Sequence, residues 1–434
     1  MQQDRPLSQT TLFKATLLAA STLTVMSGAT IAPALPKMEA HFDQVQGVEY
    51  LVRLVLTMPA LLIVFGGPIA GLLADRIGRK ALLVGATVLY GVAGSSGYAL
   101  SSLGAIIVGR AFLGVAVAGL MTAVTTLIAD YYAGAARSQF MGIQAAAMGF
   151  GGVIFLSVGG QLADLGWRLP FLIYLAAFAI LPFILFVLYE PRANLPTTVQ
   201  QEITTPVANP QVVDAHGQDA LTADRPTQVQ PTVINRISKM PRSPSMLIVI
   251  YVIAFAYMTI FYMIPVQLPY YLEVLSQASA GQSGLAMALF TLFSSIASLF
   301  YGRIKAKLNF AVIIALATVL FGVGYVALGA ANSYVQSLAG LAIGGLGAGL
   351  IMPNLNVWTT IAAPAEIRGR ALGILTAAYF LGQFVSPFVS TPLGNRFGMD
   401  ITFIAVGIAL LLVGVTLGIS LSRQTTTITD SGKR

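Results

Sequence analysis

Long apolar segments alternate with short polar segments along almost the whole chain. The apolar segments are about 20 residues or longer, which is the length that a helix needs to cross a bilayer. Their residues do not alternate between polar and apolar as they do in the strands of a membrane barrel, so helices are expected. The pattern predicts an all-α membrane protein with twelve membrane-spanning helices, over residues 11–35, 50–72, 81–101, 104–128, 138–160, 167–188, 246–272, 282–303, 309–330, 334–361, 368–392 and 400–421.

One long polar segment, residues 190–245, separates the sixth and seventh predicted spans. It contains Pro, Gln, Thr, Val and scattered charges without a sustained period, which is typical of a flexible linker. We therefore predict an N-terminal six-helix bundle over 1–189, a cytoplasmic linker over 190–245, a C-terminal six-helix bundle over 246–422 and a cytoplasmic tail over 423–434.

The second half of the chain repeats positions of the first half at an offset of 231 residues. Arg137 and Gly142 fall on Arg368 and Gly373 at this offset, and further Ala, Gly and Met positions match in the same order. A six-helix unit repeated in parallel is the layout of two transporter lobes around a central axis. We therefore predict two pseudo-symmetric bundles.

The composition excludes a soluble protein and several kinds of site. Hydrophobic residues make up 56% of the 434 residues and charged residues only 9%, whereas a soluble domain carries about 25% charged residues. There is no cysteine, and both histidines lie in predicted loops, so we expect no metal site and no cofactor.

The net charge of +8 is explained by membrane topology rather than by a nucleic-acid partner. When the N-terminus is placed inside, nineteen Lys and Arg residues fall on cytoplasmic segments and three fall on outer loops. This bias predicts that both termini are cytoplasmic.

A dense charged turn, residues 71–80, lies between the second and third predicted spans. Charges are costly at bilayer depth, so the turn should lie at a membrane surface. Asp75 is placed to meet a helix N-terminus of the other lobe, and Arg79 can bridge Asp75 to Asp130 at the end of the fourth span. We expect a conformational latch formed by Gly71, Asp75, Arg76, Gly78, Arg79 and Asp130.

The spacing G-x-L-A-D-R-x-G-R-K of this turn resembles the signature between the second and third helices of the major facilitator superfamily. Glycines of the fifth span and the sequence Gly166-Trp167-Arg168 resemble the drug-exporter branch of that family. The resemblance implies a twelve-helix transporter that works by alternating access. It also implies a cavity lined by the first, fourth, seventh and tenth helices.

Arg110 lies inside the fourth predicted span, about 9 Å from its start at 1.5 Å per residue. A charge at this depth should face the interior or a wet cavity. Residues 109–114 resemble the fourth-helix motif of the family, which implies that Arg110 serves proton coupling or binds anionic groups. The alternative is an arginine that snorkels to the outer surface. Arg53 lies nearer the end of its helix, where we expect an interfacial residue paired with Glu49.

All sixteen acidic residues fall in predicted loops, tails or helix ends. Proton-driven carriers usually use a buried carboxylate whose pKa is moved towards neutrality, and the predicted spans offer none at mid-membrane. Proton coupling therefore stays open at this point, with Glu49 and Glu273 nearest to the required position.

Neutral polar side chains within the spans mark a candidate substrate cavity. Several share a helix face at three- and four-residue spacing, and others lie near prolines that free backbone groups. The expected cavity residues are Thr30, Arg110, Met121, Thr125, Gln144, Tyr262, Gln267, Asn354, Asn356, Tyr379 and Gln383.

These observations favour a monomeric secondary active transporter of a bacterial inner membrane that exports small amphiphilic organic compounds. Its expected partners are a small-molecule substrate, the lipid bilayer and, if transport is ion-coupled, protons. The alternative is a facilitator or importer of a polar metabolite or organic anion, with Arg110 as the anion's partner. An enzyme is not expected, because the predicted spans contain no His, Cys, Asp or Glu to build a catalytic site.

Overall fold

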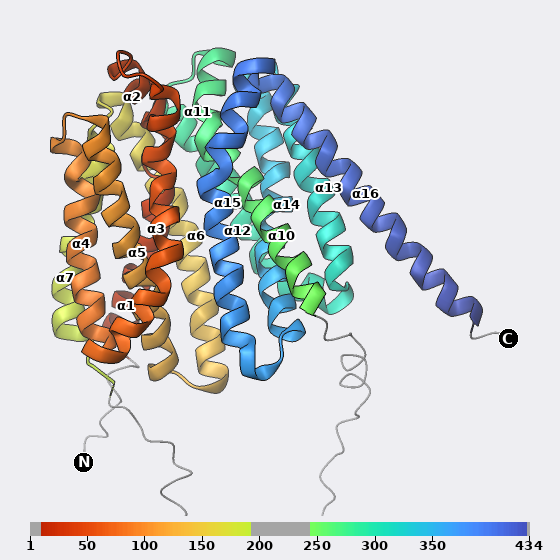
Figure 1. The fold of residues 1–434 in the computed structure, drawn as a ribbon, viewed down its shortest axis with the longest axis horizontal. Coiled ribbons are helices and arrows are strands. Elements are labelled where there is room, and N and C mark those ends of the chain that lie inside the picture. Colours follow the sequence, from red (N-terminus) through yellow and green to blue (C-terminus); the bar gives the residue numbers. More distant parts are fainter. Residues whose placement is uncertain (1–9, 192–243, 432–434) are drawn as a thin grey trace, which may run out of the picture.

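The computed structural model describes residues 10–191 and 244–431. Within these ranges, twelve helices are long and apolar enough to cross a membrane, as the hydropathy pattern predicts. They stand side by side in two bundles, coloured red to yellow-green for the first half of the chain and green to blue for the second (Figure 1).

The N lobe, which precedes the predicted linker, contains six spans. Its elements are α1 (Thr11–Ala29), η2 (Ala32–Ala34), α2 (Leu35–His41), α3 (Val48–Ile77), α4 (Arg79–Ala99), α5 (Leu103–Tyr131), α6 (Gly134–Leu165), η3 (Leu169–Leu175) and α7 (Ala176–Val187).

The C lobe contains the other six spans. Its elements are α10 (Pro244–Phe261), α11 (Met263–Ser276), α12 (Ala280–Lys307), α13 (Phe310–Gly329), α14 (Tyr334–Ala362), η4 (Ala365–Ile367), α15 (Arg368–Phe397) and α16 (Met399–Ser431).

Several helices extend beyond the predicted spans. The 30 residues of α3 would measure about 45 Å at 1.5 Å per residue, whereas the hydrocarbon core is about 30 Å thick. The charged ends of such a helix therefore reach the headgroup region. Helix α16 continues to Ser431, so the residues described after 423 are helical rather than an irregular tail.

The first and seventh spans are broken near the middle of the molecule. In the first span, α1 gives way to the short η2, which contains Pro33. In the seventh span, Tyr262 lies between α10 and α11, three residues before Pro265. Proline lacks a backbone N–H and interrupts the helical hydrogen bonds. In a membrane such breaks are tolerated where they line a cavity or are buried in protein.

Successive spans alternate in direction, so their connections gather at two ends of the molecule (Figure 1). We call the end that holds the α2–α3, α6–η3 and α11–α12 connections the Arg53 end, and it is uppermost in Figure 1. We call the opposite end, with the α3–α4, α5–α6 and α14–α15 connections, the Asp130 end.

The lobes meet mainly along two helix pairs, α6 with α12 and α3 with α15. Near the Arg53 end, α6 and α12 approach closely because glycines face each other. A Cβ built on Gly284 would lie only 2.5 Å from the carbonyl oxygen of Leu156 and 3.0 Å from the Cα of Gly160. Small residues are what allow such close packing between membrane helices.

Candidate functional site

A cavity of about 200 Å³ lies between the two lobes, next to the breaks in the first and seventh spans. We call it the central cavity. Hydroxyl and amide groups come from Thr24, Ser27, Thr30, Tyr262 and Gln383, and apolar surface comes from residues such as Phe155, Met258, Phe261 and Phe380. Its wall contains no Asp, Glu, Lys, Arg or His among the described residues. The cavity therefore suits a small, largely apolar molecule that carries a few hydrogen-bonding groups.

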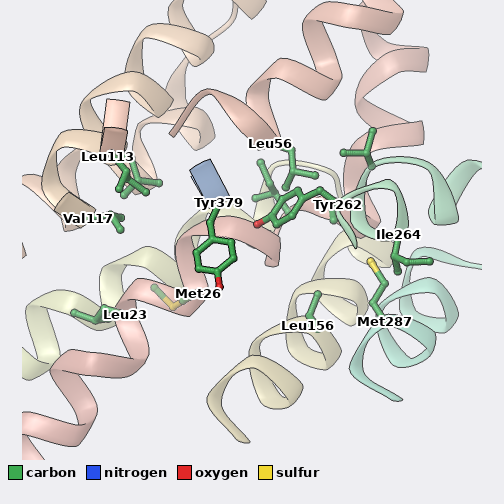
Figure 2. Packing of buried hydrophobic residues seen from close by; sticks show 14 of the residues in the cluster. Leu23, Met26, Leu56, Leu113, Val117, Leu156, Tyr262, Ile264, Met287 and Tyr379 are labelled. Atoms are coloured by element: carbon green, nitrogen blue, oxygen red, sulfur yellow. The ribbon is translucent and has the colours of Figure 1, made fainter. Parts of the chain in front are cut away.

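Tyr262 is the polar group that the break in the seventh span brings to the centre. A Cβ built on Gly28 would lie 2.6 Å from the Tyr262 hydroxyl, so the tyrosine packs tightly against α1 of the other lobe. Figure 2 shows Tyr262 between apolar side chains of the N lobe, such as Leu56, and of the C lobe, such as Ile264. The hydroxyl thus lies where the two lobes meet.

Two larger cavities adjoin the central cavity on its Asp130 side. The first, about 520 Å³, is lined by α6, α10, α12 and α14 and includes Asn356; it shares Met258 and Phe261 with the central cavity. The second, about 630 Å³, is lined by α3, α5 and α15 and includes Met121; it shares Ile63 and Phe380. We call them the Asn356 cavity and the Met121 cavity. The space between the two lobes is therefore open from the central cavity towards the Asp130 end.

At the Arg53 end the lobes are instead tied together around Arg53 of α3. The Arg53 guanidinium is 3.0 Å from a carboxylate oxygen of Glu39, and the two side chains are 7% and 27% exposed. Across the interface, Arg53 Nε donates to Gln267 Oε1 at 3.4 Å, and the guanidinium lies over the Tyr270 ring, 4.2 Å from its centroid.

The interlobe contact continues through Gln267 of α11. Its amide nitrogen donates to the hydroxyls of Ser390 at 2.9 Å and Thr391 at 3.0 Å. These bonds fix the orientation of the amide, so its oxygen faces Arg53. An ion pair in the N lobe is thus joined to a hydrogen-bonded cluster in the C lobe.

Two further hydrogen-bonded contacts cross the interface at this end. The Asp164 carboxylate of α6 accepts from the Ser279 hydroxyl at 2.8 Å and from the backbone N–H of Gly281 at 3.0 Å. It therefore caps the N-terminus of α12, where the helix dipole favours an anion. The Glu49 carboxylate accepts from the Asn395 side chain at 2.7 Å.

The expected cavity residues fall into separate groups. Thr30, Tyr262 and Gln383 line the central cavity. Met121 and Asn356 line the two cavities on the Asp130 side. Thr125 is exposed on α5, where its hydroxyl donates to the Met121 carbonyl. Gln267 lies in the Arg53 contact and does not line the central cavity.

Arg110 lies in the interior, as its depth predicts, but it does not line the central cavity, where it was expected among the cavity residues. It is 1% exposed inside the N lobe. Its three nitrogens donate to the carbonyl of Val55 at 2.8 Å, the hydroxyl of Tyr174 at 2.8 Å and the carbonyl of Ser27 at 2.6 Å. Pro59 has no N–H to donate to the Val55 carbonyl, and Ser27 lies in the last turn of α1, so both carbonyls are free to accept from Arg110. Arg110 joins α1, α3 and η3, and it does not snorkel.

Three other expected cavity residues also have partners within their own lobe. Asn354 donates to the Phe310 carbonyl and accepts from Tyr301, and it is fully buried. Gln144 donates to Ser21, and Tyr379 donates to the Met352 carbonyl at 3.4 Å. None of the three lines the central cavity.

One of the contacts expected around the charged turn is present at the Asp130 end. Arg79 and Asp130 form an ion pair of 3.3 Å, and Gly78 adopts a left-handed φ of +92° that favours glycine. Asp75 and Arg76 are exposed. At Gly71 a Cβ would meet nothing within 4 Å, so no close helix contact requires a glycine there in this conformation.

Two acidic residues that matter here were not singled out from the sequence. Glu190 was assigned to the linker, yet its carboxylate accepts from the backbone N–H groups of Arg79 and Lys80, both at 2.7 Å. The predicted spans place Glu39 in the loop between residues 35 and 50, and the sequence predicts that Arg53 pairs with Glu49. In the structure Arg53 forms its ion pair with Glu39. Glu49 contacts Arg53 only through its backbone carbonyl, which accepts a hydrogen bond from the guanidinium.

The family model of the Major Facilitator Superfamily matches residues 17–278 and 266–429, which together cover most of the chain. The chain belongs to the Major Facilitator Superfamily. Members of this family are transporters rather than enzymes, as the resemblance of residues 71–80 implies.

Curated relatives include proteins named for multidrug transport, multidrug resistance and efflux. Multidrug transporter protein MdtP of Bacillus subtilis (strain 168) is 26% identical over 40% of this chain and 32% of its own length. Multidrug resistance protein 1 of the same organism is 35% identical over 29% of this chain and 33% of its own length. The efflux pump dotC of Dothistroma septosporum is 31% identical over 42% of this chain and 31% of its own length. The matches thus span about a third of the length of these relatives.

Solved structures with the same fold include a D-xylose–proton symporter, with a TM-score of 0.70 and 16% identity, covering 94% of this chain and 97% of that one. The human organic anion transporter MFSD10 gives a TM-score of 0.63 at 17% identity, covering 94% of this chain and 100% of that one. At these identities the likeness establishes the twelve-helix fold with its two six-helix bundles.

Proposed function

We propose that this transporter exports small amphiphilic organic compounds by alternating access, with protons as the coupling ion. The observation that carries the proposal is the uncharged, partly aromatic central cavity between the lobes. Such a wall offers dispersion and hydrogen-bonding contacts without requiring a particular substrate charge. The name of the efflux pump dotC and the names of the multidrug relatives support the direction of transport.

We assign the Asp130 end to the cytoplasm of a bacterial cell, in the inner membrane, because the excess of Lys and Arg falls on that side. With this orientation the described conformation faces inward. The Asn356 and Met121 cavities then form the cytoplasmic approach to the central cavity, and the contacts around Arg53 and Asp164 close the outer end. Export requires these outer contacts to break.

The latch formed by Gly71, Asp75, Arg76, Gly78, Arg79 and Asp130 has its proposed role in the opposite conformation. When the Asp130 end closes, the exposed Asp75 would approach the N-terminus of a C-lobe helix, whose dipole attracts an anion. The Arg79–Asp130 pair holds the turn in place meanwhile. We propose that residues 1–189 and 246–422 form the two lobes, that residues 190–245 form the linker between them and that residues 423–434 form the cytoplasmic tail. We also propose that the transporter works as a monomer.

Import or facilitation of an organic anion has weaker support. That alternative needs the Arg110 guanidinium in the cavity, but its nitrogens are engaged by two carbonyls and a hydroxyl inside the N lobe. The sugar and organic-anion transporters among the solved structures share the fold at 16–17% identity and give no preference for either substrate.

Transport by inside-out vesicles with an imposed pH gradient tests the proposal across a panel of neutral, cationic and anionic amphiphiles. We expect uptake of neutral amphiphiles, which corresponds to export from the cell, and proton release from the vesicles on substrate addition. Gln383→Ala should lower uptake, and Gln144→Ala, a change outside the cavity, should not. Uptake of anions alone, lost in Arg110→Lys while the protein stays folded, would favour the alternative.

A further inference from the structure

We propose that the Asn356 cavity is a second subsite for the substrate and that it binds an uncharged end group bearing several hydroxyls. The apolar end of the same compound then occupies the central cavity. The proposal deepens the export function above and rests on it, since it names the class of compound that is exported. That class is a neutral amphiphile with a hydroxylated head, such as an aryl glycoside.

The central cavity is too small to hold a typical substrate alone. Its volume is about 200 Å³, whereas most small-molecule sites measure roughly 300–1,000 Å³. The Asn356 cavity adds about 520 Å³, and Met258 and Phe261 belong to the walls of both cavities. One elongated molecule can therefore extend from the centre into the Asn356 cavity.

A row of hydroxyls on α12 leads from the central cavity into the Asn356 cavity. Three- and four-residue spacing places four hydroxyl residues on one face of the helix, namely Thr291, Ser294, Ser295 and Ser298. The hydroxyls of Thr291 and Ser295 donate to backbone carbonyls four residues earlier, at 2.9 and 2.8 Å. Those of Ser294 and Ser298 have no hydrogen-bond partner among the described residues, so both are available to a ligand.

Helix α14 adds acceptor groups to the wall of the same cavity. The Asn356 amide nitrogen donates to the Met352 carbonyl at 3.0 Å, while its amide oxygen accepts from no described group. Gly349 and Pro353 also line the cavity. Proline has no N–H, so Pro353 leaves the Gly349 carbonyl without its usual helical donor. Acceptors without a donor favour ligand groups that donate, such as hydroxyls.

The rest of the wall favours an uncharged ligand. It contains no Asp, Glu, Lys, Arg or His within the part of the chain that the structure describes, so a charged group would lose hydration without gaining a countercharge. Helix α6 supplies an apolar surface from small residues such as Ala145 and from the ring of Phe150. A Cβ built on Gly149 would lie 2.5 Å from the Ser295 hydroxyl, so this glycine brings α6 close to the hydroxyl row.

Binding of tritiated naphthyl glucoside to the protein in nanodiscs tests the proposal without requiring transport. Empty nanodiscs correct for partition of the probe into lipid. The matched probe is the fully O-methylated glucoside, which keeps the naphthyl group and the lack of charge but has no hydroxyl donor. We expect the glucoside to bind about tenfold more tightly than the methylated probe, since it can donate to the free acceptors. Equal affinities would overturn the proposal.

Variants identify the groups that bind the hydroxylated head. Ser294→Ala combined with Ser298→Ala removes two hydroxyls that bond to nothing else described, so the fold should persist while glucoside affinity falls about tenfold. Asn356→Leu should lower it about fivefold. Neither change should weaken binding of the methylated probe. Thr416→Ala, an exposed position on α16, is the control and should leave both affinities unchanged. Glucoside binding at wild-type affinity in the double variant would overturn the proposal.

Cysteine protection locates the bound probe. The chain has no native cysteine; Ala145→Cys lies in the wall of the Asn356 cavity and Ala377→Cys in that of the Met121 cavity. The glucoside should slow alkylation of the first by N-ethylmaleimide and leave the second unchanged. Protection of neither cysteine, or of Ala377→Cys, would overturn the proposal.

The outcomes separate the subsite from the export function. If the glucoside binds as expected but no amphiphile is exported, the subsite stands and the export function fails. If amphiphiles are exported but the variants bind the glucoside like the wild type, export stands and the subsite fails.

Discussion

The carboxylate of Glu190 caps the helix that begins at Arg79, with Oε1 2.7 Å from the Arg79 backbone nitrogen and Oε2 2.7 Å from that of Lys80. Glu190, three residues after the end of the sixth span at Val187, is thereby attached to the charged turn between the second and third spans. A negative charge at this position satisfies free N–H groups and interacts favourably with the helix dipole.

Replacing Glu190 by alanine should therefore destabilise the N lobe by roughly 0.5–1 kcal/mol. Glu190→Gln keeps the acceptor oxygen and should cost less. Thermal unfolding in detergent measures both changes, with the exposed Glu366→Ala as the control. Equal melting temperatures for Glu190→Ala and the control would show that the cap does not stabilise the N lobe.

Arg110 should behave as a structural residue of the N lobe. Arg110→Gln leaves the Val55 and Ser27 carbonyls and the Tyr174 hydroxyl without their charged donor, at a cost of about 2–4 kcal/mol. Tyr174→Phe removes one of the three bonds and should cost about 1–2 kcal/mol. The expected result is loss of folded protein in parallel with loss of transport. A stable Arg110→Gln protein with altered substrate charge preference would contradict this assignment.

The glycine contact between α6 and α12 should be required for closure at the Arg53 end. A methyl group at Gly284 would collide with the Leu156 carbonyl, and relieving such a clash costs about 1–3 kcal/mol. Gly284→Ala should therefore raise the population that is open at the Arg53 end, as reported by the distance between spin labels on Val45→Cys and Val274→Cys, one exposed position on each lobe at this end. Gly67→Ala, where a Cβ meets nothing within 4 Å, should leave the distance unchanged.

The sequence predicted the spans and the charged turn well because both depend on local properties. Twelve apolar segments are visible in hydropathy alone, and the pairing of Arg79 with Asp130 follows from two charges that lie near the same membrane surface. Thr30 and Tyr262, which line the central cavity, were selected for a similar reason, since each lies near prolines that break a span.

The contacts around Arg53 could not be predicted in the same way. Arg53 and Gln267 are 214 positions apart, and Gln267 and Ser390 are 123 apart. Their meeting depends on how the two lobes dock, which no local period encodes. The same limit explains Arg110: its depth indicated an interior position, but only the packed helices reveal which carbonyls accept its bonds.

Asp75→Asn should slow transport while leaving the described conformation intact. Asp75 is exposed in this conformation, so its neutralisation removes nothing that stabilises it. The loss of an anion at a helix N-terminus in the opposite conformation should lower the transport rate about twofold to fivefold. Initial rates in vesicles measure this, with thermal unfolding as the control for folding. Unchanged rates would remove Asp75 from the latch.

Alternating access of the central cavity is the claim on which the account depends, and a single cysteine at Thr24 tests it most directly. Thr24 lines the central cavity, and the absence of native cysteines makes labelling with a membrane-impermeant thiol reagent specific. We predict that Thr24→Cys reacts from the Asp130 side in the absence of substrate and increasingly from the Arg53 side while an amphiphile is being transported. Reaction from one side only under both conditions, with and without substrate, would contradict the account.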